Sequence, residues 1–353
     1  MAKQNSPMEA GERVPNFFLK DQWNKDFHFY VSITGGPIVF VVLAPGDEGN
    51  KALLRALEKK LPEFEAQNAH LYAISDDTVE SHAALSRELD LHFPLFADPE
   101  GQVTGWFLTT AQVQAPVVFV LDPNQRLISL KSGANGEAST LPGHALREVT
   151  KIAPKGKPRV FSEVAPVLFV PNVFTPDYCQ HLIELWQAGD HTDGMIRSGG
   201  EQKKDPYVKR RKDYSIVSDM EKVHEIRDII GPRLGPEAEK IYYYGSFVFE
   251  AFRIGCYEDT DAGFFKPHRD NFSDNLEHRR YAVSINLNTG EYEGGDLRFP
   301  EYGPDLYRPP TGGAIVFSCC LLHEVLPVTK GRRFVFLTFL GGSPKSKGNA
   351  GSG

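Results

Sequence analysis

The chain has 353 residues, of which 41% are hydrophobic and 24% are charged, a composition typical of a folded globular protein with enough apolar residues for two cores. The formal net charge of −7 argues against general attraction to nucleic acid or to an anionic membrane surface. The apolar runs have the length of strands, and the start of the chain has no secretion-signal pattern. Four cysteines without a CxxC pair indicate reduced thiols. We therefore expect a cytoplasmic protein with neither membrane nor nucleic-acid partners.

The first half of the chain alternates predicted strands and helices. Residues 50–67 have apolar side chains at the spacing of an amphipathic helix, and a second helix is predicted over 77–89. Residues 92–101 are expected to form a loop. Strands are predicted at 37–44, at 70–75 and in two successive runs within 116–130. This order predicts an α/β layer fold.

Residues 11–130 resemble the thioredoxin-like fold and, within it, the peroxiredoxin family. The similarity rests on Val14-Pro15-Asn16-Phe17, the Pro45-Gly46-Asp47 turn, the segment 93–99 and a late Phe-Val-Leu-Asp strand. It also predicts a cis peptide bond at Ala115-Pro116.

One departure from the peroxiredoxin pattern decides what this half can do. The position of the family's peroxidatic cysteine is occupied by Ala52, and no cysteine precedes Cys179. Thiolate chemistry requires sulfur, so we predict a non-catalytic domain. Its expected role is packing, partner docking or homodimer formation.

A proline-rich segment separates the two halves. Residues 152–166 contain three prolines and no helical period, which indicates a linker. A helix is predicted to begin after Thr175-Pro176, and another is predicted over 219–230. Between them, residues 191–213 are polar and glycine-rich, with six basic residues from Lys203 to Lys212. Three interpretations remain open for this segment: a solvated loop, a lid whose charge selects an acidic substrate, or a local nucleic-acid patch, which the acidic net charge disfavours.

The sequence contains two His-x-Asp pairs. On a strand this spacing places both side chains on one face, and with one distant histidine it forms the 2-His-1-carboxylate arrangement that binds non-haem iron(II). His268-Arg269-Asp270 is followed by an alternating strand pattern, by glycine turns and by a strand that ends at His323. The other pair, His191-Thr192-Asp193, lies in the glycine-rich segment, and its nearest partner His224 falls in a predicted helix. We therefore predict the metal site at His268, Asp270 and His323.

Arg333 completes the predicted site. It lies ten residues beyond His323, across a hairpin that turns at Lys330-Gly331. From there it can enter the same interior as the metal ligands and bind a carboxylate in bidentate fashion, whereas Arg332 should face outward. Cys319 and Cys320 have no second sulfur pair at metal spacing and are interpreted as small strand residues.

Residues 160–340 resemble the 2-oxoglutarate/Fe(II)-dependent dioxygenase superfamily, and within it the prolyl 4-hydroxylase-like branch. The specific marks are the His268-Arg269-Asp270 motif, the Gly294-Gly295-Asp296-Leu297 turn, Gly312-Gly313, His323-Glu324-Val325 and Gly331-Arg332-Arg333. The resemblance implies Fe(2+) at His268, Asp270 and His323, 2-oxoglutarate at Arg333, and ascorbate as reductant. Prolyl hydroxylases place a tyrosine in the strand before the triad, and the matching place here is near Arg253, with Tyr257 close by.

The two resemblances together predict the domain order. An α/β thioredoxin-like domain over 1–151 is followed by the linker over 152–166. An all-β double-stranded β-helix (jelly-roll) domain with flanking helices then covers 167–342, and a flexible tail covers 343–353.

The activity implied by the resemblance is hydroxylation of an unactivated C–H bond with release of succinate and carbon dioxide. The substrate remains open between a prolyl or related residue of a protein or peptide and a small metabolite. The alternative function is a non-catalytic 2-oxoglutarate-binding sensor or adaptor that uses the thioredoxin-like domain for partner docking.

Overall fold

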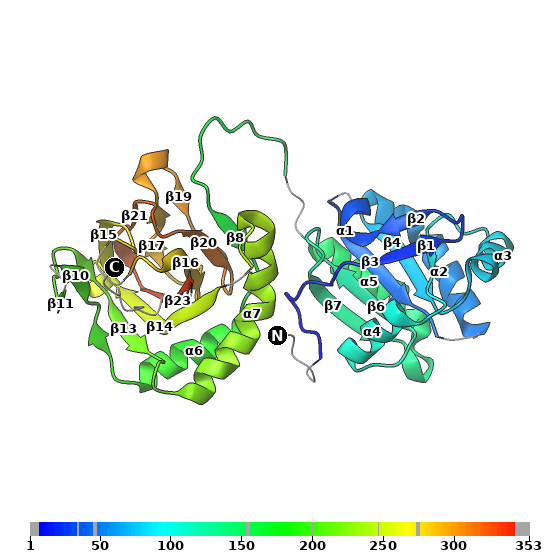
Figure 1. The fold of residues 1–353 in the computed structure, drawn as a ribbon, viewed down its shortest axis with the longest axis horizontal. Helices are drawn as coiled ribbons and strands as arrows, with labels where there is room; N and C mark the ends of the chain where they lie inside the picture. Colours follow the sequence, from blue (N-terminus) through cyan, green and yellow to red (C-terminus); the bar gives the residue numbers. More distant parts are fainter. Residues whose placement is uncertain are drawn as a thin grey trace, which may run out of the picture. The chain divides into compact units, whose positions relative to one another are not determined.

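The computed structural model describes residues 7–33, 35–44, 48–152, 156–198, 201–245, 247–272 and 276–342. The chain divides into two compact units, Met1–Lys157 and Pro158–Gly353 (Figure 1). The expected Pro45-Gly46-Asp47 turn, residues 153–155 of the linker and the tail 343–353 lie outside the described residues. Within the described part, no helix combines the length and the apolar character needed to cross a membrane.

A seven-stranded sheet forms the centre of the first unit, in the order β2-β1-β5-β4-β3-β6-β7. The pairs β3–β4 and β4–β5 are parallel, and β6 is antiparallel to β3. All five residues of β3 are buried because the two faces of the sheet enter separate cores. Val39 and Val41 pack with residues of α2 and α5, while Phe40 stacks on Phe107 of α4. The predicted α/β thioredoxin-like fold is confirmed.

The elements of this unit have the following bounds. The strands are β1 (Phe18–Asp21), β2 (Asp26–His28), β3 (Ile38–Val42), β4 (His70–Ser75), β5 (Leu95–Ala97), β6 (Val117–Leu121) and β7 (Leu127–Ser132). The helices are α1 (Phe29–Ser32), α2 (Glu48–Ala66), α3 (Val79–Leu89), α4 (Gln102–Ala111) and α5 (Leu141–Lys151), with 3-10 turns η1 (Ala134–Gly136) and η2 (Ala138–Thr140).

The sequence prediction for 92–101 was wrong in one respect, because the expected loop contains β5. This strand has only three residues and lies between Pro94 and Pro99, so its alternation is too short to recognise, yet all three residues are buried. The predicted cis peptide bond at Ala115-Pro116 is confirmed.

Two facing antiparallel sheets form the second unit. One has seven strands in the order β8-β20-β16-β23-β14-β13-β9, and the other has five in the order β12-β15-β21-β18-β19. A hydrophobic core lies between them, with Tyr257 and Val335 from the larger sheet and Leu297 and Val325 from the smaller one. The outer face of the larger sheet packs against α6 and α7 (Figure 1). The predicted jelly roll with flanking helices is confirmed.

The strands of the second unit are β8 (Leu168–Val170), β9 (Thr192–Asp193), β10 (Ile196–Ser198), β11 (Glu201–Lys203), β12 (Lys209–Arg210), β13 (Lys212–Ser215), β14 (Val248–Glu258), β15 (Phe264–His268), β16 (Arg279–Asn286), β17 (Glu293–Gly294), β18 (Leu297–Arg298), β19 (Leu306–Tyr307), β20 (Ala314–Ser318), β21 (His323–Val325), β22 (Val328–Lys330) and β23 (Arg332–Gly341). Its helices are α6 (Pro176–Ala188), α7 (Met220–Tyr242), η3 (Asp259–Asp261) and η4 (Pro300–Tyr302).

Helix α7 is longer than the sequence predicts. Asp219 accepts a hydrogen bond from the Lys222 amide and begins the helix as expected, but α7 continues past Ile230 through two prolines, Pro232 and Pro236. The extension buries Leu234 and Ala238 against the larger sheet. Tertiary packing therefore outweighs the breaking tendency of the prolines.

The last residues of the segment 191–213 are part of the sheets and do not form a solvated loop. Lys209 begins β12, which pairs with β15, and β13 pairs with β14. Lys209 and Arg211 are buried, with only 5% of Lys209 exposed. At this end of the segment Lys209 and Arg211 thus face the interior, whereas Lys212 is exposed.

Candidate active site in the second unit

Strand pairing brings the three predicted metal-binding residues together. His268 is the last residue of β15 and His323 the first of β21, and the two are partners in the antiparallel register of these strands. Asp270 follows in the turn, where its amide donates to the carbonyl of Cys319 at 3.0 Å. One hydrogen-bonded strand pair therefore positions all three side chains.

The atoms that would bind a metal converge. The Nε2 atom of His268 lies 3.6 Å from one Asp270 oxygen, and Nε2 of His323 lies 3.4 Å from the other. The Nδ1 atoms point the other way, to the carbonyls of Lys266 at 2.8 Å and Leu321 at 3.0 Å. A carbonyl oxygen only accepts, so each Nδ1 carries the proton and each Nε2 offers its lone pair. Among the described residues this is the one group of three or more side chains with metal-ligand spacing.

The charge states at this cluster suit a divalent ion. Burial tends to raise the pKa of Asp270, but the imidazoles of His323 and His268 overcome this and hold it well below its ordinary value. Burial lowers the pKa of His323 to about 4, against the opposing effect of Asp270. At neutral pH the cluster therefore consists of a carboxylate beside a neutral imidazole, the protonation states that ligate metal.

Arg333 lies in the interior of the same unit and is 1% exposed. It is the register partner of Tyr257, and its guanidinium carbon is 5.5 Å from the centre of that ring. One nitrogen, Nη2, donates to Oδ1 of Asn286 at 3.0 Å. Nε and Nη1 are buried and have no hydrogen-bond partner among the described residues. A buried guanidinium with two unused donors is suited to receive a carboxylate.

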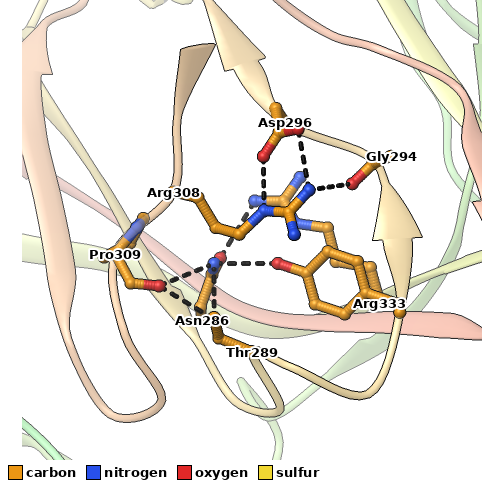
Figure 2. Close-up of polar contacts among 8 residues, drawn as sticks. Asn286, Thr289, Gly294, Asp296, Arg308, Pro309 and Arg333 are labelled. Carbon is orange, nitrogen blue, oxygen red and sulfur yellow. Dashed lines mark hydrogen bonds and ion pairs between the residues drawn. The ribbon is translucent and has the colours of Figure 1, made fainter.

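Asn286 is held so that its oxygen faces Arg333 (Figure 2). Its Nδ2 donates to the hydroxyls of Thr289 and Tyr292, both at 3.0 Å, and to the carbonyl of Pro309 at 3.2 Å. These acceptors fix the amide orientation and leave Oδ1 for the arginine. Asn286 cannot be recognised from the sequence alone, because its partners are known only once the strands are paired.

The Gly294-Gly295-Asp296 turn closes over Arg333. Gly295 has φ +67°, and a Cβ placed there would lie 2.8 Å from Cγ2 of Val328 and 3.1 Å from Cδ of Arg333. A larger residue would therefore press on the arginine. Asp296 accepts a hydrogen bond from Nη2 of Arg308 at 2.7 Å, and the same nitrogen donates to the Gly294 carbonyl at 2.9 Å (Figure 2).

One cavity of about 720 Å³ contains all four predicted residues, His268, Asp270, His323 and Arg333, in its lining. Its walls also contain Lys209 and Arg211 of the basic segment 191–213, for which a lid was one interpretation. Arg211 makes two hydrogen bonds to Asp213, at 2.5 and 2.8 Å, and donates to the Tyr257 hydroxyl at 3.2 Å. A Cβ at Gly255 would lie 2.8 Å from Arg211, so this glycine makes room for the ion pair.

Lys209 lies beside this ion pair in the cavity wall. Its Nζ is 3.6 Å from an Asp213 oxygen and donates to the Met195 carbonyl at 3.3 Å. Burial, aided by the charge of Arg211, lowers the pKa of Lys209 to about 7. Lys209, Arg211 and Asp213 alternate along the chain, and this period of two is the signal that indicates one face of a strand.

Comparison with known families agrees with this geometry. Residues 252–341 match the 2OG-Fe(II) oxygenase superfamily, and residues 10–129 match the AhpC/TSA family. The chain is a fusion of an AhpC/TSA family domain and a 2OG-Fe(II) oxygenase domain.

Individual relatives match one part of the chain each. Procollagen-lysine,2-oxoglutarate 5-dioxygenase 1 of Gallus gallus is 28% identical over 180 residues, which are 48% of this chain and 23% of that protein. A PKHD-type hydroxylase of Cupriavidus metallidurans is 26% identical over 175 residues, 47% of this chain and 73% of that protein. The structure of peroxidoxin BcpB from Mycobacterium tuberculosis is 23% identical and covers 42% of this chain and 99% of that one, with a TM-score of 0.37. The match thus spans about a quarter of the length of the Gallus gallus relative.

The other His-x-Asp pair of the oxygenase domain has structural partners. The His191 ring stacks on Trp186 with centroids 3.8 Å apart, and Asp193 forms an ion pair with Lys204. His224 is an exposed residue of α7. The two cysteines also differ from expectation, since they follow β20 in a turn, with Cys319 buried and Cys320 exposed.

Proposed function

We propose that the oxygenase domain catalyses Fe(II)- and 2-oxoglutarate-dependent hydroxylation of an unactivated C–H bond. The observation that carries this proposal is one cavity lined by both a His268/Asp270/His323 cluster and a buried arginine with two unused donors. Ferrous iron bound there, together with 2-oxoglutarate and dioxygen, supplies oxidising power, with succinate and carbon dioxide as products.

The chain's own residues have separate roles in this proposal. His268, Asp270 and His323 would hold the ion, and with only three protein ligands it would have room to bind the cosubstrates. Arg333 binds the far carboxylate of 2-oxoglutarate, and Asn286 keeps its guanidinium in place.

Aromatic rings support the two histidines and keep water away from them. Phe265 stacks on His268 with centroids 3.4 Å apart, and Phe317 lies edge-on to His323 at 4.6 Å. These ring contacts, together with the hydrogen bonds to the carbonyls of Lys266 and Leu321, fix the orientation of both imidazoles. The site therefore needs little rearrangement on metal binding.

The remaining roles are also proposals. Ascorbate is the reductant that we expect to restore over-oxidised iron. The primary substrate is a residue of a protein or peptide, or a small metabolite, and the relatives' names supply one precedent of the first kind, since procollagen lysine is their named substrate. The AhpC/TSA domain, with Ala52 on α2 in place of the peroxidatic cysteine, serves docking of a partner or of a second copy of the chain.

The decisive test uses purified protein under anaerobic conditions. Addition of ferrous iron and then 2-oxoglutarate should produce the visible absorption of the chelate, and admission of oxygen should release succinate. His268→Ala should abolish both signals, whereas His224→Ala, which removes an exposed histidine of α7, should change neither.

Two outcomes would contradict the proposal. Absorption without succinate in a single turnover would indicate the non-catalytic 2-oxoglutarate sensor or adaptor. If the wild-type protein shows neither the absorption nor succinate release, the oxygenase assignment itself is wrong.

A further inference from the structure

Arg253 is a basic residue of the cavity that the proposed chemistry does not use. It lies on β14, opposite Ser215 of β13 and Leu337 of β23, and its side chain contributes to the cavity lining. Tyr257, four residues further along β14, lines the same cavity. Four residues of a strand span about 13 Å, so this is the backbone separation between Arg253 and Tyr257, the register partner of Arg333.

Arg253 differs from the other cations of the cavity in having no partner in the part of the chain that the structure describes. Arg211 is paired with Asp213, Arg279 with Glu250, and Arg269 with Glu301. Lys209 also contacts Asp213. The Arg253 guanidinium makes no hydrogen bond and no ion pair with any residue that the structure describes.

The surroundings leave this charge uncompensated. Burial lowers the pKa of Arg253, and the neighbouring guanidiniums of Arg211 and Arg279 lower it further, against the attraction of Asp213 and Glu250. The guanidinium nevertheless stays protonated at neutral pH. Because Asp213 and Glu250 are already paired with Arg211 and Arg279, a partly buried Arg253 without a partner of its own among the described residues is a site that an anion would stabilise.

The side chains around Arg253 indicate what kind of anion fits. Leu337 and Phe339 of β23 form an apolar floor beside it, and Ala282 of β16, the register partner of Phe339, extends this floor. Arg279, whose charge acts on both Arg253 and Asp270, connects this end of the cavity with the metal-binding residues. A cavity of about 720 Å³ is in the range that encloses small molecules.

We infer that Arg253 binds a carboxylate of the primary substrate, a small organic acid with an apolar body whose C–H bond is thereby directed toward the metal site. This inference rests on the proposed function. It assigns the two ends of the cavity to two different carboxylates: Arg333 to 2-oxoglutarate, and Arg253 to the substrate.

The test compares acids with their neutral amides. Hexanoate with hexanamide, N-acetyl-L-leucine with its amide, and N-acetyl-L-proline with its amide would be titrated by calorimetry into the full chain. The titrations are run on the protein as isolated and again after anaerobic addition of ferrous iron and 2-oxoglutarate. At least one acid should bind more tightly than its amide. Arg253→Met should weaken that acid about tenfold to a hundredfold and leave the amide unchanged, because a hydrogen-bonded charge pair is lost.

Two variants control for indirect effects. Arg253→Lys retains the charge but not the bidentate fork and should give intermediate affinity. Arg227→Met removes an exposed arginine of α7 and should leave acid binding unchanged. The unfolding temperature of each variant shows whether it is folded, and if Arg253→Met is not, Arg253→Lys decides the result.

The outcomes separate this inference from the proposed function. Equal binding of the acid by wild type and Arg253→Met, or no preference for any acid over its amide, would overturn the inference. The inference would also be overturned if no small acid bound while a blocked glutamate peptide bound more tightly than its glutamine counterpart. Acid binding through Arg253 in a protein that never binds 2-oxoglutarate would instead overturn the proposed function alone.

Discussion

Replacing Arg333 with methionine should change ligand affinity and protein stability in opposite directions. The guanidinium is buried, and two of its donors have no partner among the described residues. Each hydrogen bond to a charged group contributes about 1.5–3 kcal/mol, so losing two to the 2-oxoglutarate carboxylate should weaken its binding at least about a hundredfold.

Without ligand, the free energy of unfolding of the variant should not fall. Each buried unsatisfied donor costs about 1–3 kcal/mol, and methionine removes two of them. The substitution also leaves Oδ1 of Asn286 without its donor, at a similar cost for one group. We therefore expect the free energy of unfolding to be unchanged or higher by up to about 3 kcal/mol.

Urea unfolding with and without 2-oxoglutarate, in the presence of Mn(II), measures both quantities. In wild type, 2-oxoglutarate at a hundred times its Kd should stabilise by about 2.7 kcal/mol, and in Arg333→Met this gain should vanish. Arg332→Met is the matched control, since Arg332 is the exposed neighbour on the opposite face of β23. A variant that loses more than about 2 kcal/mol without ligand, yet keeps the gain with 2-oxoglutarate, would refute the reasoning.

Three other substitutions test the remaining parts of the site. Asp270→Ala should weaken Mn(II) binding by more than about a hundredfold in an electron paramagnetic resonance titration. Loss of a residue that only orients a metal ligand costs about tenfold to a hundredfold in affinity, and loss of the ligand itself should cost more. Asp228→Ala on α7 should have no effect. Gly295→Ala should weaken 2-oxoglutarate binding by pressing on Arg333, whereas Gly290→Ala, which also has positive φ but no neighbour within 4 Å, should not; equal effects would contradict the contact argument. Between the folded pKa of about 7 and the ordinary value of 10.5, Lys209 is protonated in the unfolded chain but largely neutral in the folded one. The free energy of unfolding of wild type, relative to Lys209→Met, should therefore rise with pH by up to about 1.4 kcal/mol per pH unit in this range. A difference between the two proteins that is constant from pH 7 to pH 10 would show that Lys209 does not titrate there.

Much of the fold could be predicted from local sequence patterns. The sheet of the first unit follows from apolar runs such as β3, whose residues are buried on both faces wherever the strand sits in the sheet. The predicted start of α6 is also confirmed, because Thr175 accepts from the Tyr178 amide and Pro176 needs no amide partner. Helix α7 could not be bounded in the same way, since its last three turns depend on burial against a sheet formed by distant residues.

What the sequence determined by itself is the set of candidate residues: a histidine and an aspartate at strand spacing, a distant histidine, an arginine one hairpin later, and a first half without sulfur. The orientation of the cavity's basic wall was decided only by the tertiary structure. A bulge between Glu250 and Arg253 inserts one extra residue into β14 opposite β23. A shift of one residue exchanges the two faces of a strand, so reading alternate positions from the start of β14 does not show that Arg253 enters the cavity. That fact depends on the register with β13 and β23, and register is a property of the assembled sheet.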